Sequence, residues 1–339
     1  MSCTGSLSAN PDISGIGVRL SFYIQAFFTM VLAYIPGASS DASYWSMTIT
    51  AFALFASALA LYGQDDLYLH EAILISILLY LHAYAAVLCV MPLFSDSDLH
   101  HGVLYTNAQL IVHFGRAMLR MMPVLLAATV FGLFVWTHAA SFGPEPTCNV
   151  QTTLVLLGAH LEATRAGRTA ALVFVGVNTY FIGGCAILCA VLAFKAHTSP
   201  NELLLPNSNP ASQWTKAPAI GGPDIHARIA FSPTFKRFSL PLQYMLFVFL
   251  IAVFVINVEL TIVANRPLLD DGAENNAWTL GQIFPVVMLG VPATSFVSYF
   301  RDASTARVRQ RAREELERRP VVGVSSAEWH ERLHLRLVY

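Results

Sequence analysis

The sequence predicts an all-α membrane protein, a bundle of seven transmembrane helices with the N-terminus outside and the C-terminus in the cytoplasm. Hydrophobic residues make up 55% of the 339 residues and charged residues only 12%, whereas a soluble domain has about 25% charged residues. Seven apolar runs are long enough to cross a bilayer as helices. Arg and Lys also gather on one side of the bundle that these runs would form. Lipid is therefore the expected surroundings of most of the chain.

The predicted spans follow one another with short connections in the first half of the chain. In chain order they are residues 16–35, 44–62, 71–93, 121–139, 169–194, 242–264 and 278–300. Two shorter apolar pieces, 103–114 and 152–159, cannot cross a bilayer. We interpret both as interfacial or helix-extending segments.

The remaining chain divides into an arm, a loop and a tail around the membrane domain of residues 16–300. Residues 1–15 form a short outer N-terminal arm, without the basic start and apolar core of a cleaved signal peptide. The inner loop 195–240 is rich in Pro, Ser and Asn and has no hydrophobic period, which predicts disorder. Residues 301–339 are an Arg-rich cytoplasmic tail whose first part is expected to form a charged helix.

Orientation follows from the basic residues. With the C-terminus inside, 16 of the 20 Lys and Arg residues face the cytoplasm, nine of them after Phe300. The outer ones are Arg19, Arg165, Arg168 and Arg266. The opposite orientation would contradict the positive-inside rule.

Sequence signals mark the ends and bends of individual spans. Asn10 is a predicted N-cap and Pro11 a first helical residue at the start of the first span. Ser21, Gln25 and Thr29 follow at four-residue spacing and place one polar face on that helix. In the seventh span, Pro285 and Pro292 each remove a backbone donor and favour a kink.

Glu259, the one formal charge in the run 242–264, is the first candidate for chemistry. A charged residue at mid-membrane costs about 2.5 to 3.5 kcal/mol on insertion scales, so the carboxylate needs a partner, a proton or water. One hypothesis makes it a ligand anchor or proton carrier. The structural alternative is an ion pair or hydrogen bond with Arg19, which lies at similar depth. Asn257 and Thr261 are each about 200° around the helix from Glu259, so they serve a different neighbour.

Three further side chains have the same two interpretations. Arg19 contacts a ligand or simply extends to the outer interface. His82, in the third span, and Gln282, near the outer end of the seventh, are ligand-binding candidates or ordinary interhelical hydrogen-bonding residues.

Cysteines and acidic residues on the outer side are the remaining candidates for a disulfide and for ligand binding. Cys3 and Cys148 both fall on the outer side, where oxidation is expected, and a disulfide between them is predicted. Acidic pairs such as Asp65 and Asp66 would recruit a cation or a basic peptide, or are simply solvated. No metal, cofactor or nucleic acid is expected. The spans lack the His and Asp clusters of a metal site, no Lys in the seventh span offers a retinal Schiff base, and no catalytic constellation predicts an enzyme.

Four stretches of the sequence resemble one known family. They are NPDISGIGVRLSFYIQ, the Cys148–Asn149 pair, NVELTIVAN and WTLGQIFPVV. Together they resemble a family of uncharacterised fungal seven-helix integral membrane proteins with an N-terminal NPDIxGIGVR signature. The resemblance spans most of the membrane region, excludes the inner loop and the tail, and implies a fungal source. It implies no activity and no functional residue.

These observations leave three function hypotheses open. The first is a receptor-like multispanning protein that binds a small-molecule or peptide ligand in the outer half of the bundle through Glu259, Arg19 and Gln282. The second is a small proton-linked transporter or channel gated by Glu259. The third is a non-catalytic membrane scaffold that acts through the basic tail, whose arginines are expected to contact anionic inner-leaflet lipid. The sequence does not distinguish the plasma membrane from an endomembrane.

Overall fold

The seven predicted membrane spans are present as helices. The computed structural model describes residues 7, 10–35, 41–95, 107–198, 233–269 and 280–318. Within these ranges, seven helices are long and apolar enough to cross a membrane. The prediction of an integral, multi-pass protein surrounded by a lipid bilayer is therefore confirmed at this level.

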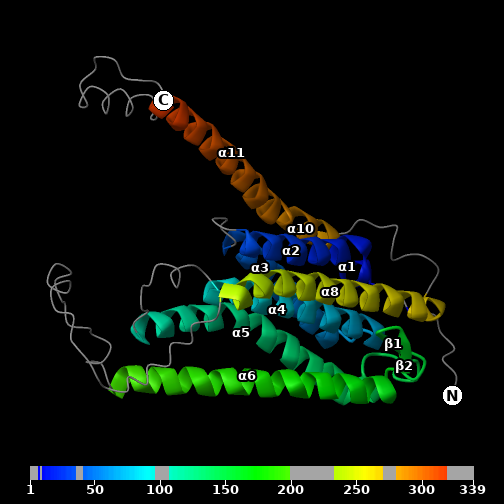
Figure 1. The fold of residues 1–339 in the computed structure, drawn as a ribbon. Helices are drawn as coiled ribbons and strands as arrows, with labels where there is room; N and C mark the ends of the chain where they lie inside the picture. The colour runs from blue at the N-terminus through cyan, green and yellow to red at the C-terminus, as the bar shows by residue number, and fades with distance from the viewer. Residues whose placement is uncertain are drawn as a thin grey trace.

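The elements run along the chain as helices interrupted by one β-hairpin (Figure 1). They are α1 (Pro11–Ser14), α2 (Ile16–Tyr34), α3 (Asp41–Gly63), α4 (Leu69–Ser95), α5 (Asn107–His138), η2 (Ala139–Ser141), β1 (Thr153–Leu156), β2 (Ala159–Glu162), α6 (Ala166–Thr198), α8 (Pro233–Asn265), η4 (Arg266–Leu268), α10 (Leu280–Met288) and α11 (Gly290–Arg318).

Helix α4 is the centre of the bundle. It is apolar on all sides, as expected for a fully enclosed helix, and it packs against α2, α3, α5 and α8. In its most apolar stretch 83% of the residues are buried, against 11% in α6 and in the span formed by α10 and α11. These two outer elements therefore depend least on the core, and α11 extends away from the bundle at its far end (Figure 1).

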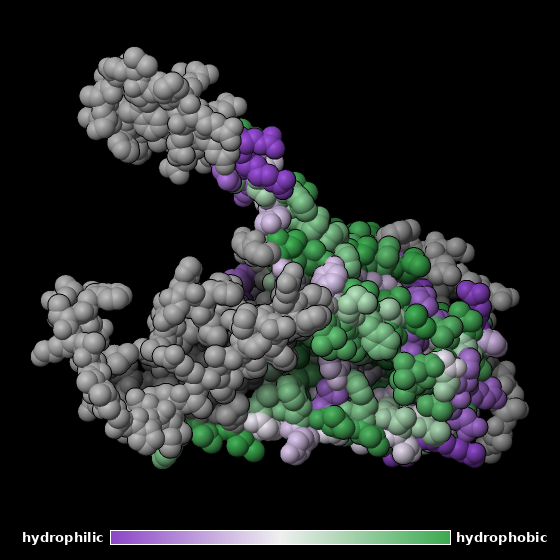
Figure 2. Space-filling view, in the orientation of Figure 1, coloured by the Kyte–Doolittle hydropathy of each residue, from purple (hydrophilic) through white to green (hydrophobic). Residues whose placement is uncertain are grey.

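The surface matches the environment expected of a membrane domain. Apolar side chains cover the middle of the bundle, while hydrophilic ones gather at the far end of α11 and at the opposite end, near β1 and β2 (Figure 2). Exposed apolar groups are stable in such a band because lipid replaces water around them.

Two local predictions were wrong in part. Residues 152–159 form β1 and the hairpin turn, so they do not extend a helix. Helices α6 and α8 continue to Thr198 and from Pro233, so both ends of the predicted disordered loop 195–240 are helical; its middle lies outside the described residues. The fourth candidate span, Arg120–Ser141, agrees with the predicted span 121–139, although its helix, α5, begins earlier, at Asn107. Of the predicted piece 103–114, the described part from Asn107 extends α5, one of the two expected roles.

The predicted bend of the seventh span is a break between α10 and α11. Pro292 has no N–H to donate to the carbonyl of Met288, four residues earlier, and the Ser46 hydroxyl donates to that carbonyl instead, at 3.0 Å. The Leu289 N–H turns to Val286 O, and the Gln25 Nε2 group donates to Pro285 O at 3.4 Å. Polar side chains of α2 and α3 thus satisfy the carbonyls that the break frees.

Candidate functional site

Arg19 and Glu259 form the ion pair that the sequence suggested as an alternative to ligand binding. The Arg19 Nη1 group lies 2.5 Å from both Glu259 carboxylate oxygens, and the Tyr23 hydroxyl donates to the same carboxylate at 2.9 Å. The exposed fraction of the side chain is 5% for Arg19 and 43% for Glu259. A buried guanidinium is stable here because the carboxylate neutralises it.

The Nε group of Arg19 satisfies a backbone carbonyl at the break between α1 and α2 in the first span. Gly15 is extended between α1 and α2, so the helical hydrogen-bond pattern stops there. The Arg19 Nε group donates to Ser14 O at 2.8 Å, which satisfies a carbonyl at the end of α1. Neither Arg19 nor Glu259 lines either of the two cavities described below. The contacts of the pair are those of a structural element.

Gln282 lies in a helix crossing. Its Oε1 accepts from the Gly17 N–H at 3.3 Å, and its side chain occupies the space where Gly15 and Gly17 have no Cβ. On the neighbouring position a Cβ at Gly281 would come within 2.6 Å of the Asp12 Cβ. These glycines let α10 approach α1 and α2 closely, so the NPDISGIGV and LGQIFP stretches are packing partners.

His82 is fully buried behind the wall of a cavity. Its ring stacks on Phe22 with the centroids 4.1 Å apart, and its Nε2 lies 3.2 Å from Phe22 O. Phe22 lines the cavity and His82 does not. His82 therefore supports a lining residue and has no direct access to a ligand.

Cys148 is disulfide-bonded, while its predicted partner, Cys3, lies outside the described residues. Close to Cys3 in the sequence, Leu7 pairs with Leu269, which follows η4, and the Leu7 backbone nitrogen lies 2.8 Å from Leu268 O. Asn149, beside Cys148, donates its amide to the carbonyls of Ala139 and Phe142, which close the end of α5. The pairing of Cys148 with Cys3 stays a prediction.

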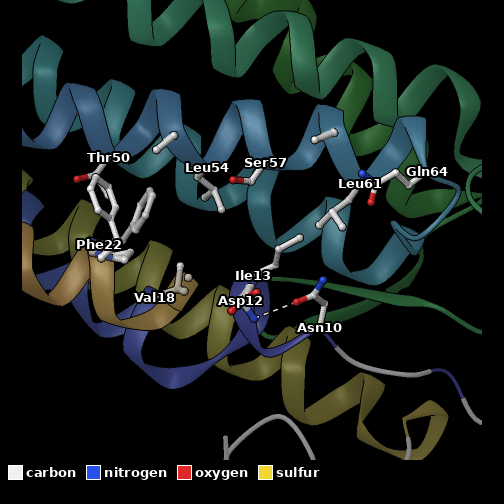
Figure 3. A pocket seen from close by; sticks show the side chains of 15 residues that line it. Asn10, Asp12, Ile13, Val18, Phe22, Thr50, Leu54, Ser57, Leu61 and Gln64 are labelled. Carbon is white, nitrogen blue, oxygen red and sulfur yellow. Dashed lines mark hydrogen bonds between the residues drawn. The ribbon is translucent and has the colours of Figure 1, made fainter. Parts of the chain in front are cut away.

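The larger of the two cavities lies between α3, the α1–α2 segment and α10, and has a volume of about 510 Å³ (Figure 3). Ligand pockets measure about 300 to 1,000 Å³. The α3 wall carries small side chains, Ala53, Ser57 and Ala60, which leave the space open. Phe22 and Val18 of α2 form an apolar wall opposite.

One end of this cavity is polar and acidic. Asn10 and Asp12 lie together there, and Gln64 lies across the cavity from them, in the turn after α3 (Figure 3). Asp12 is the only charged residue among those that line the cavity. Its backbone is held by the Asn10 side chain, which accepts from the Asp12 N–H at 3.0 Å, as the predicted N-cap requires. The acid is exposed and lines the cavity.

Glu71 adds a buried carboxylate close to this end. Its Oε1 accepts from the Asn10 N–H at 2.6 Å and its Oε2 from the Tyr68 N–H at 3.2 Å. The second contact is the reciprocal half of a capping box at the start of α4. Burial, and then the carboxylates of Glu145, Glu71 and Asp66, raise the pKa of the Tyr68 hydroxyl. Carboxylates therefore continue from Asp12 towards the start of α4.

The cavity also touches the bend of the seventh span. Phe284 and Pro285 of α10 line it, and Pro285 O is the carbonyl that Gln25 holds. A ligand that fills the cavity would press on the segment whose geometry decides where α11 points. Sequence reasoning missed Asp12 and Gln64 as site residues; the signal was present for Asp12, an acid within the glycine-rich stretch that the resemblance highlighted.

Comparisons with known proteins identify no relative: no family model, curated protein or solved structure matches the chain. Among the described residues, no group of three or more His, Cys, Asp or Glu side chains could hold a metal ion.

Proposed function

We propose that this chain is a receptor-like membrane protein whose outer half binds a cationic amphiphile in the cavity between α1, α2, α3 and α10. The observation that carries the proposal is the shape and charge of that cavity. A single exposed carboxylate, Asp12, stands at one end and an apolar wall built on Phe22 at the other. An ammonium head group would meet the acid, and an alkyl chain would lie against the wall.

The polar groups around Asp12 fit a cation better than an anion. No residue that lines the cavity is basic, and the amide oxygen of Gln64 offers a second acceptor. The Asn10 side-chain oxygen already accepts from a backbone N–H. Hydrogen bonds to a charged group contribute about 1.5 to 3 kcal/mol, which corresponds to about ten- to hundredfold in affinity.

Binding would be transmitted through the seventh span. The ligand contacts α10 at Phe284 and Pro285, and the break after Met288 separates α10 from α11. Because α11 is little buried by the bundle, a small change in the break would swing its Arg-rich end. That end is the output in this proposal, placed on the cytoplasmic side against anionic lipid, with the N-terminus outside.

Thermal unfolding in lipid nanodiscs tests the ligand class. Dodecylamine is compared with dodecanol and dodecanoate, which share its chain but not its charge. We expect dodecylamine alone to stabilise the wild-type protein, and Asp12→Asn to weaken its apparent affinity about ten- to hundredfold. The matched control is Asp65→Asn, an acid in the nearby turn that lines neither cavity. Its positive φ of 58° suits Asn.

A second pair of variants tests the place of binding. Ser57→Phe fills the cavity from α3, whereas Leu59→Phe adds the same ring on the exposed side of that helix. Loss of stabilisation in Ser57→Phe alone supports the site. Equal stabilisation by all three probes, or an unchanged affinity in Asp12→Asn, would reject it.

The second candidate, a transporter or channel, is favoured by a seam of buried polar side chains between α2, α3 and the break. Its members are Ser21, Gln25, Thr29, Ser43, Ser46 and Thr50. Gln25 and Ser46 already hold freed carbonyls, which gives the seam a structural role. Reconstituted vesicles with a proton-sensitive dye separate the two candidates, because a transporter moves protons or its substrate across the bilayer and a receptor does not.

A further inference from the structure

The second cavity lies on the other side of the bundle, between α4, α5, α6, α8 and β1, and has a volume of about 280 Å³. None of its lining residues carries a charge. The lining residue Phe174 of α6 is 39% exposed and Leu156 of β1 is 40% exposed, so the cavity reaches the lipid-facing surface. Access is therefore from the bilayer, without passage through water.

The β-hairpin forms one wall of this cavity at membrane depth. On α8, Asn265, Thr261 and Asn257 lie four residues apart on one face. They accept the N–H groups of Thr153, Val155 and Leu157, at 2.8, 3.1 and 2.9 Å.

The spacings of the two elements match. Four helical residues rise about 6 Å, and two strand residues rise about 6.6 Å. Every second N–H of the strand therefore meets one polar side chain of the helix. This ladder satisfies a strand edge that lipid could not satisfy.

The ladder runs down the membrane span of α8. Asn257 lies about 16 Å along the helix from Leu268, where that span ends. The hairpin tip, with Leu157 73% exposed, is thus beside the span rather than above it. Leu154 to Leu157 present an apolar wall to whatever lies between α6 and α8.

The Asn257 amide is one of the polar groups that line the cavity, together with the hydroxyls of Ser76, Tyr80 and Tyr84. The Asn257 Oδ1 atom accepts from Leu157, while its Nδ2 group has no acceptor among the described residues. A ligand oxygen is the natural partner for that donor, because a buried unpaired amide is costly. A charged head group is disfavoured, since no countercharge lines the cavity.

Aromatic rings, tilted against one another, line the opposite walls. Tyr84 lies between Phe174 and Phe254, with ring centroids 6.1 and 5.7 Å away. Tyr80 meets Phe174 edge-on at 4.8 Å. All four rings line the cavity. Such an apolar cavity favours a rigid hydrophobe, because a rigid ligand loses little conformational entropy on binding.

We infer that this cavity is a binding site for a sterol, an uncharged membrane lipid with a fused-ring body and one hydroxyl group. The ring system lies between the aromatic walls and the hairpin, and the hydroxyl oxygen accepts from Asn257 Nδ2. The tail extends between α6 and α8 into the lipid. The site is separate from the cavity beside Asp12 and does not depend on the function proposed for it.

A photoreactive sterol in phosphatidylcholine vesicles tests the inference on the full-length protein. After irradiation, labelled peptides are mapped by mass spectrometry, with unlabelled sterol or diacylglycerol as competitor. We expect labelling near Phe174 and Leu156 that excess sterol removes and diacylglycerol does not. Ala170→Phe fills the cavity from α6 and should lower this labelling about tenfold, since an overfilled cavity excludes the ligand.

Val177→Phe is the matched control, because it adds the same ring to α6 at a site that is 63% exposed and does not line the cavity. Leu250→Trp fills the cavity from α8 and serves as a second cavity-filling variant if Ala170→Phe does not fold. Should neither filled variant fold, the competition on the wild-type protein decides. Labelling spread evenly over the lipid-facing helices, equal labelling in the filled variants, or equal competition by diacylglycerol would each overturn the sterol assignment.

Discussion

The ion pair between Arg19 and Glu259 allows a sharp test of whether this charge is structural. Glu259→Gln keeps the shape of the side chain and removes its charge, which leaves the Arg19 guanidinium buried without a countercharge. Arg19 has a side-chain exposure of only 5%. The Tyr23 hydroxyl, 2.9 Å from the carboxylate, keeps an acceptor in the amide oxygen.

The expected loss follows from the burial of the two partners. Breaking a buried pair by removal of one charge costs about 3 to 5 kcal/mol. Glu259 is 43% exposed, so screening lowers the figure, and we expect about 2 to 3 kcal/mol. Arg19→Leu should cost at least as much because it also removes the hydrogen bond to Ser14 O. The double variant should lose less than the sum, with a coupling energy of about 1 to 3 kcal/mol.

The measurement is the free energy of unfolding in mixed micelles, followed by circular dichroism over a titration with dodecyl sulfate. The same Glu259→Gln protein should still be stabilised by dodecylamine, because Glu259 does not line the cavity beside Asp12. A loss below about 0.5 kcal/mol for Glu259→Gln, or additive single variants, would refute the structural role. If Glu259→Gln lost the stabilisation by dodecylamine while its stability stayed unchanged, Glu259 would have to be part of the ligand site.

The remaining predictions concern the hairpin, a helix crossing, the bend and the disulfide. Asn265→Leu removes both hydrogen bonds to Thr153, at 2.8 and 2.7 Å, and should speed amide hydrogen exchange in β1 about tenfold or more, while the exposed Val263→Leu should not. Gly281→Val places a side chain on Asp12 and should cost about 1 to 3 kcal/mol, whereas Gly183→Val, with nothing within 4 Å of its Cβ, should cost about 1 kcal/mol or less. Ser46→Ala should cost about 1 kcal/mol and clearly less in a Pro292→Ala background, where a backbone N–H can reach Met288 O; an equal cost in both would argue against the repair of the bend. Non-reducing peptide mapping should find Cys3 linked to Cys148, and a free thiol at Cys3 would contradict the pairing.

Local sequence rules were sufficient to predict the positions of the spans, the N-cap of the first helix and the break in the seventh. Spans are set by runs of apolar residues, which act through length and transfer free energy and need no knowledge of neighbours. The cap at Asn10 and the break before Pro292 follow from backbone chemistry within one turn, whereas Pro285 lies inside α10. The 200° separation of Glu259 from Asn257 and Thr261 also came from helix geometry, and the structure places them on different partners.

The hairpin at 153–162 escaped sequence reasoning because it is stabilised from outside. The four-residue strand TLVL, followed by a Leu-Gly turn, is too short to stand alone, and Leu157 adopts a positive φ of 51° that Leu normally avoids. The strand is held by side chains of α8 that lie about a hundred residues later. The sequence does show Asn257, Thr261 and Asn265 on one face of α8, but their role as acceptors for a strand can be recognised only when the strand is seen beside them.

The amino-acid order alone was enough to establish a multispanning helical protein and to select Arg19 as a partner for Glu259, since both statements depend on depth along single helices. Packing between distant helices decided the rest. Packing brings Glu259 into an ion pair with Arg19 and places Gln282 where α10 crosses the glycines of the first span. It also buries His82 behind Phe22 and leaves cavities beside Asp12 and Asn257. A cavity is the space that several helices leave between them, and no single helix carries that information.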